Sequence, residues 1–128
     1  MAATASGDNS SDGENCKLEL KQFTRPPYAS FGKARIGEEK QCTVFVQNFS
    51  DKSVAVRIEK FPSDKKTLHS FGVAIRNCIV YSGDEIPIVF SWTPAHAGKI
   101  RETAHFVVNE SFKLQAHLLG EAPEPLKK

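Results

Sequence analysis

The chain has 128 residues, of which 40% are hydrophobic and 25% are charged, the balance of an ordinary soluble protein. A chain of this length fits one domain and buries roughly two thirds of its unfolded surface, so its core needs no disulfide or metal. The cysteines, Cys16, Cys42 and Cys78, are odd in number and widely spaced, which favours a reducing compartment. No segment has the apolar length of a membrane span or the character of a signal peptide, so we expect a cytoplasmic or nuclear protein without membrane insertion.

The net charge of +2 is unevenly distributed along the chain. Residues 1–16 contain three acidic side chains and no lysine or arginine, whereas the remainder contains 17 basic and 12 acidic side chains. A mildly basic domain suggests an acidic partner, with a merely solvated surface as the alternative, and falls short of a nucleic-acid-binding composition. We expect residues 1–16 to form a disordered acidic tail, 17–122 a folded domain, and 123–128 a tail or linker.

Between the tails, alternating apolar and polar residues predict seven or eight short strands. The first spans 18–23, and a turn at 25–28 with two prolines separates it from the second, at 31–36. In the third strand, at 42–48, alternate residues from Cys42 onward share the inner face.

The middle of the chain continues this alternation. Val54, Val56 and Ile58 point inward in the fourth strand, and a polar loop at 63–67 follows. Residues 71–81 form one long strand or two short ones.

The last third of the chain holds three further apolar runs. Their predicted inward residues are Ile86, Ile88, Phe90, Trp92, Ala104, Phe106, Val108, Phe112, Leu114, Ala116 and Leu118. Pro87 lacks an amide donor, so its strand should be an edge at this point or begin there. Each sheet alone would leave a row of apolar side chains in water, and two sheets packed face to face bury both rows. We therefore predict an all-β sandwich with Trp92 near the centre of its core.

Residues with catalytic or metal-binding chemistry are sparse. The histidines are His69, His96, His105 and His117. His105 and His117 fall on the outward faces of strands that should be adjacent, so they could approach each other. A zinc site needs three or four ligands, and no cysteine or carboxylate pattern completes one. Cys42 and Cys78 fit strand positions as small core residues. We predict no catalytic residue, metal site or cofactor, and no enzymatic activity.

Several short motifs, in this order and at this spacing, resemble the ASH domain, which is named for the abnormal spindle, spindle-defective and Hydin proteins. They are Phe31-Gly32, the strand that ends at Asn48, Phe61-Pro62, Trp92-Thr93-Pro94 with Gly98, Phe106–Asn109 and Leu118-Leu119-Gly120. The resemblance covers 17–122 and is greatest to the N-terminal domain of the abnormal spindle microcephaly-associated family.

This resemblance implies an immunoglobulin-like sandwich of the type found in major sperm protein. It also implies a non-catalytic scaffold in mitotic spindle organisation, located at spindle poles, centrosomes or the base of cilia and in the nucleus during interphase. The implied partners are microtubules or spindle-pole and centrosomal proteins, without a small-molecule substrate. Abnormal spindle proteins continue into calponin-homology and calmodulin-binding regions, which the sequence ending at Lys128 lacks, so those contacts are not carried over.

Basic side chains are the candidate partner-binding residues, because the microtubule lattice is acidic. They are Lys33, Arg35, Arg57, Lys60, Lys65, Lys66, Lys99 and Arg101. Solvated charges scattered around a sandwich are the alternative interpretation. A second hypothesis is an adaptor of the major-sperm-protein type, in which an exposed edge strand accepts an extended acidic peptide that Arg57 and Lys60 help to steer.

Overall fold

The computed structural model describes residues 13–59 and 69–124, which form nine β-strands and no helix. The strands are β1 (Cys16–Glu19), β2 (Tyr28–Lys33), β3 (Lys40–Gln47), β4 (Val54–Ile58), β5 (His69–Val73), β6 (Asn77–Val80), β7 (Glu85–Pro94), β8 (Gly98–Val108) and β9 (Phe112–Ala122). Since there is no helix among these residues, none of them forms a helical membrane span. The predicted count of seven or eight strands was therefore too low.

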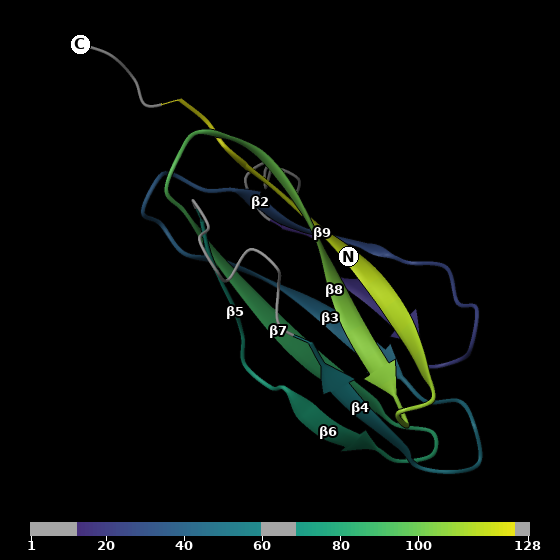
Figure 1. The fold of residues 1–128 in the computed structure, drawn as a ribbon. Helices are drawn as coiled ribbons and strands as arrows, with labels where there is room; N and C mark the ends of the chain where they lie inside the picture. The colour runs from purple at the N-terminus through teal and green to yellow at the C-terminus, as the bar shows by residue number, and fades with distance from the viewer. Residues whose placement is uncertain (1–12, 60–68, 125–128) are drawn as a thin grey trace, which may run out of the picture.

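The strands form two sheets packed face to face (Figure 1). One sheet has four strands in the order β1-β3-β7-β5, and the other has five in the order β2-β9-β8-β4-β6. The β8–β9 hairpin runs along the length of the five-stranded sheet. Two pairs are parallel, β1 with β3 and β2 with β9, and the other pairs are antiparallel. The predicted all-β sandwich is confirmed.

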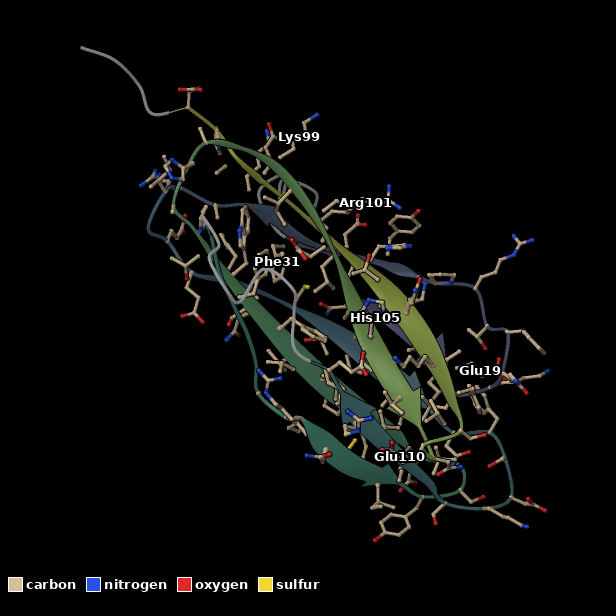
Figure 2. All side chains as sticks on the ribbon, in the orientation of Figure 1. Glu19, Phe31, Lys99, Arg101, His105 and Glu110 are labelled. Carbon is tan, nitrogen blue, oxygen red and sulfur yellow. The ribbon has the colours of Figure 1, made fainter. Side chains whose placement is uncertain are left out.

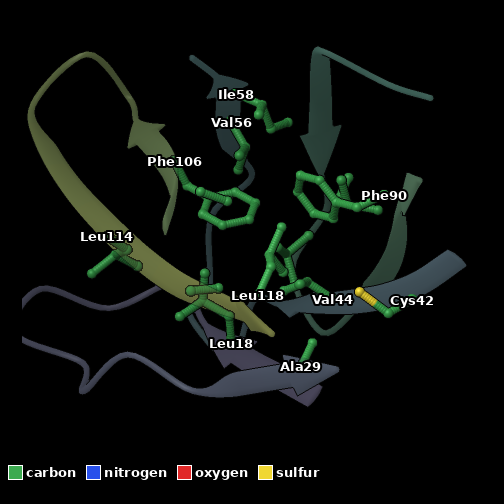
Figure 3. Packing of buried hydrophobic residues seen from close by; sticks show 14 of the residues in the cluster. Leu18, Ala29, Cys42, Val44, Val56, Ile58, Phe90, Phe106, Leu114 and Leu118 are labelled. Carbon is green, nitrogen blue, oxygen red and sulfur yellow. The ribbon is translucent and has the colours of Figure 1, made fainter. Parts of the chain in front are cut away.

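The core lies between the two sheets and contains most of the residues that alternation placed inside, while Ile86 and Phe112 are only partly buried against it. Trp92, Phe31, Phe90 and Phe106 are fully buried. Phe90 of β7 and Phe106 of β8 face each other across the two sheets, with ring centroids 6.2 Å apart at 84° (Figure 3). Trp92 lies against Phe31, with ring centroids 5.5 Å apart. Aromatic rings in these tilted and edge-on arrangements contribute beyond the area that they bury.

The N-terminal segment changes sheets within two residues. The backbone of Glu14 exchanges two hydrogen bonds of 2.8 Å with Ser30 of β2, in the five-stranded sheet. Cys16 then pairs with Val44 of β3, in the four-stranded sheet. The expected tail boundary at residue 16 lies inside this pairing, whereas residues 1–12 are outside the described part of the chain.

The first predicted strand and the turn after it differ from the structure. β1 ends at Glu19, and Phe23 is 89% exposed with a φ of 71°, so it is not a strand residue. Tyr28, expected in the turn, begins β2 instead. The amide of His117 donates to the carbonyl of Pro27 at 2.9 Å, which holds this part of the chain against β9. Alternation cannot reveal such a bond to a distant strand.

Pro87 occupies the position that its missing amide hydrogen requires. β7 pairs with β3 along its length, but β5 reaches only the residues from Phe90 to Pro94. At Pro87, opposite Phe45, β7 therefore has a strand on one side only. The prediction that the strand is an edge at this proline is confirmed.

The segment 71–81 forms two strands that belong to different sheets. The amide of Ala74 donates to Val89 on β7 at 3.0 Å, which extends the pairing of β5. The amide of Ile58 donates to the carbonyl of Arg76 at 2.8 Å, which begins the pairing of β6 with β4. The chain thus crosses from one sheet to the other over residues 74–76. Of the two predicted alternatives, the structure shows two short strands.

Candidate functional site

The candidate site lies on the outer face of the five-stranded sheet, where β2, β9 and β8 run side by side. The strand register sets three rows of side chains across these strands. The rows are Tyr28, His117 and Thr103, then Ser30, Leu119 and Arg101, then Lys33, Glu121 and Lys99. Residues between them on the same strands, such as Ala29, Leu118 and Ala104, are buried in the core. Alternation alone therefore exposes these side chains together.

A bulge in β2 positions Lys33. The pairing with β9 shifts between Ser30 and Lys33, and Gly32 between them has a φ of 80°, which a side chain would make costly. The amide of Gly32 donates to the hydroxyl oxygen of Ser30 at 2.9 Å. Lys33 consequently lies opposite Glu121, near the end of the β8–β9 hairpin.

Four of the eight predicted basic residues come together at this end of the sandwich. Lys33 and Lys99 line an open depression of about 430 Å³, and Lys33 and Arg35 line a second one of about 330 Å³. Lys33 belongs to both depressions and so connects them. Arg101 lies two residues after Lys99 on the same face of β8, as Figure 2 shows on the upper part of that strand. Residues 33 and 101 are far apart in the sequence, and only the fold brings them to one face.

The basic residues differ in whether a carboxylate neutralises them. Ion pairs of 4.0 Å or less join Lys17 to Glu85, Lys40 to Glu38, Arg57 to Glu110 and Lys113 to Glu59. Among the residues that the structure describes, Lys33, Arg35, Lys99 and Arg101 take part in no such pair. These four cations therefore remain available to an acidic partner.

Arg57 does not belong to this group. It lies on β4 and makes two hydrogen bonds, of 2.9 and 3.1 Å, with the carboxylate of Glu110 after β8. This contact raises the pKa of Arg57 and lowers that of Glu110, because the hydrogen bonds and the opposite charge favour both ionised forms. Figure 2 shows Glu110 at the opposite end of β8 from Lys99. Lys60, Lys65 and Lys66 lie outside the described residues.

Three residues that the sequence did not single out for binding adjoin Arg101. Its guanidinium carbon lies 5.7 Å from the centre of the Tyr28 ring, and its Nη2 is 3.5 Å from the Tyr28 hydroxyl. The Tyr28 and His117 rings lie 4.9 Å apart at 43°. Thr103 Oγ1 lies 3.1 Å from Nδ1 of His117. The outward position of His117 in its strand could have been used to predict it as a site residue. Tyr28 and Thr103 could be placed beside it only once the strand register was known.

The pKa of His117 lies below the ordinary value for histidine. Partial burial of the ring is the main cause, and the positive charge of Arg101 adds to it. His105 does not pair with His117, because His105 lies opposite Gln115 and His117 lies opposite Thr103. No group of three or more potential metal ligands occurs among residues 13–59 and 69–124.

The three cysteine thiols have low reactivity because their pKa values are raised. Burial raises the pKa of Cys16 to about 11, and burial together with the neighbouring Cys16 thiol raises the pKa of Cys42 to about 12. Burial also raises the pKa of Cys78. Because the thiolate is the nucleophilic form, these cysteines are poor nucleophiles near neutral pH.

Taken together, the side chains on the outer face of β2, β9 and β8 offer charge, aromatic surface and hydrogen-bond donors. These are properties of a recognition surface.

Comparison with known proteins agrees with these features. The ASH family model, described as abnormal spindle-like microcephaly-associated, ASPM-SPD-2-Hydin, matches residues 17–116. Abnormal spindle-like microcephaly-associated proteins from dog and human are 34% and 33% identical over 107 and 111 residues, or 84% and 87% of this chain. The aligned region makes up only 3% of the length of each relative.

Solved structures show the same fold. The ASH or PapD-like domain 7 of human CEP192 superimposes with a TM-score of 0.65 at 12% identity and covers 98% of this chain and 95% of that one. The YadV chaperone gives a TM-score of 0.51 at 11% identity, over 91% of this chain and 52% of the chaperone chain. ASH domains are not known as catalytic. With both the sequence model and the relatives in agreement, the chain belongs to the ASH domain family.

Proposed function

We propose that the chain is a non-catalytic scaffold domain of the mitotic spindle pole and centrosome, and that it binds microtubules or microtubule-associated proteins. The proposal rests on the relatives, which carry the abnormal spindle name, and on one structural observation. That observation is the convergence of Lys33, Lys99 and Arg101 on one face without a carboxylate partner among the described residues.

Microtubules are an acidic surface that such a face would complement. The three cations come from two strands of one sheet, so the strand register sets the positions of their backbone atoms before contact. Exposed charges of this kind contribute to encounter and orientation more than to tight binding, and salt screens them. The proposed complex is therefore weak, salt-dependent and suited to a domain that acts beside others.

Cosedimentation with microtubules tests the proposal through a triple charge reversal, Lys33→Glu/Lys99→Glu/Arg101→Glu. We expect the affinity of this variant to fall by about tenfold or more, since three favourable contacts become repulsive. The matched control is Lys21→Glu/Lys52→Glu/Arg76→Glu, which changes the net charge equally at exposed positions elsewhere. Equal binding by the two triple variants would show that the binding face lies elsewhere.

A tagged copy followed through the cell cycle tests the cellular part. We expect enrichment at spindle poles in mitosis that the first triple variant loses and the control keeps. A diffuse signal for the unaltered chain would count against the spindle assignment, whatever its affinity for microtubules in solution.

A further inference from the structure

The cluster around Arg101 differs from the lysine end of the same face in its local charge balance. Glu14 and Glu121 line the depression that contains Lys33 and Lys99, so two carboxylates lie near the lysines without forming an ion pair with them. Arg101 contacts Tyr28 instead of a carboxylate, and the neighbours of Tyr28 are the His117 ring and Arg101. Arg101 is therefore the cation on this face whose surroundings most lack a negative charge.

The geometry holds the Arg101 guanidinium in place before any partner arrives. The Tyr28 ring lies beneath it, and the register of β8, β9 and β2 sets the separation of the two side chains. An arginine stacked on an aromatic ring loses less freedom when it forms hydrogen bonds. Its planar fork has five N–H donors, of which the Tyr28 hydroxyl can occupy only part.

His117 and Tyr28 add donors beside this fork. Thr103 Oγ1 lies next to Nδ1 of His117, and its hydroxyl can donate to the neutral ring or accept from the protonated one. The ring's remaining donor is then its Nε2–H. The Tyr28 hydroxyl is a further donor or acceptor at a residue that is 54% exposed. Leu119 of β9 lies opposite Arg101 of β8 and Ser30 of β2, so it is an apolar neighbour of the Arg101 side chain.

We propose that Arg101, Tyr28 and His117 form a carboxylate-binding subsite that receives an aspartate or glutamate side chain from an acidic segment of a partner protein. The charge complementarity selects this occupant. A planar guanidinium, a phenol and an imidazole converge next to the row that carries Lys33 and Lys99, and no carboxylate of the described residues forms an ion pair with Arg101. This inference rests on the proposed function, because it names the partner chemistry that the same basic face recognises.

The subsite should bind more tightly at lower pH. Groups that face His117 are Tyr28 from β2, and Arg101, Thr103 and His105 from β8, while Lys113 and Glu121 lie farther along its own strand. In the free protein, partial burial and the charge of Arg101 hold the pKa of His117 below its ordinary value. A bound carboxylate favours the imidazolium and raises that pKa. Affinity is then greatest below the free-state pKa and falls as the pH rises through the pKa of the complex.

Fluorescence anisotropy with labelled hexaglutamate, and hexaglutamine as the uncharged probe, tests the subsite at constant ionic strength. For the unaltered chain we expect hexaglutamate affinity to rise about three- to tenfold from about pH 8 to about pH 5.5, because the protonated ring attracts the carboxylate. His117→Gln should abolish the pH dependence, and Tyr28→Ala should weaken binding about threefold or more. Thermal unfolding of each variant checks that the fold is retained.

The matched control is His96→Gln, at an exposed histidine between β7 and β8 and outside the pairing of β8 with β9, and it should leave both affinity and pH dependence unchanged. If His117→Gln and Tyr28→Ala bind as the unaltered chain does while Arg101→Glu/Lys33→Glu/Lys99→Glu loses binding, the subsite is overturned and the scaffold function survives. Preference for a phosphoserine peptide over hexaglutamate would also overturn it. If the unaltered chain binds microtubules but not hexaglutamate, only this inference fails, and if it binds neither, both fail.

Discussion

Asn48 is the buried polar side chain of the described core, and each of its polar atoms has a partner. Its Nδ2 donates to the carbonyls of Lys52 and Val80, at 2.7 and 2.9 Å. Its Oδ1 accepts from the amide and the hydroxyl of Ser50, at 2.9 and 2.6 Å. One side chain thus holds the turn after β3 against the end of β6. Buried polar groups are tolerated when satisfied in this way, and they are costly when a partner is removed.

Asn48→Ala should destabilise the fold by about 2–3 kcal/mol, because it leaves backbone groups of the turn and of β6 without their partner. Urea unfolding followed by tryptophan fluorescence would measure the change, since Trp92 is the only tryptophan and is fully buried. Asn77→Ala is the control, at an exposed position of β6, and should change stability by less than about 0.5 kcal/mol. Equal losses for the two variants would refute the role assigned to Asn48.

At the scale of elements, β9 approaches β7 from the opposite sheet more closely than a side chain would permit. A Cβ at Gly120 would lie 2.6, 2.9 and 3.0 Å from three carbons of the Trp92 ring. The ring is fully buried and packs on Phe31, so it cannot move aside freely. The Trp92 and Gly120 motifs thus mark one packing contact, and they are determinants of the fold that lie beneath the binding face.

Gly120→Ala should therefore destabilise the domain by about 1–3 kcal/mol through overpacking. Gly72→Ala is the matched control on β5, where the added Cβ meets only the hydroxyl of Ser91, at 2.9 Å. That short polar side chain can rotate, so the control should cost less than half as much as Gly120→Ala. Thermal unfolding of both variants compares them directly, and a larger loss in Gly72→Ala would contradict the packing argument.

Alternation predicted the inner faces of these strands but not their neighbours. Cys42, Val44 and Val46 are buried as expected, since a period of two decides which side chains face the core. Nothing in that period says that β1 pairs in parallel with β3, or that β2 lies beside β9. Those pairings depend on contacts between segments distant in sequence.

The candidate site shows the same division at the scale of the whole molecule. Charge composition selected Lys33, Arg35, Lys99 and Arg101, and the fold brings these four to one end. Composition could not separate them from Arg57, because its partner Glu110 is distant in sequence and only the β4–β8 pairing brings the two together. Tyr28 escaped notice for a related reason, since the two prolines before it predict a turn at this position.

The buried thiol of Cys42 reports on the stability of the whole sandwich. It is 2% exposed, and its pKa of about 12 leaves almost no thiolate near pH 8, the pH at which alkylation is usually followed. Labelling of Cys42 by iodoacetamide should therefore require global unfolding. Its rate should be lower than the rate in denaturant by a factor on the order of 10³ or more. The half-buried Cys16 and Cys78 should react faster. Mass spectrometry of tryptic peptides separates the three sites.

Because Gly120→Ala acts on the same global equilibrium, it should accelerate Cys42 labelling about tenfold for each 1.4 kcal/mol lost. Labelling of Cys42 as fast as that of Cys78, and unaffected by Gly120→Ala, would instead mean that β3 opens locally without unfolding of the sandwich.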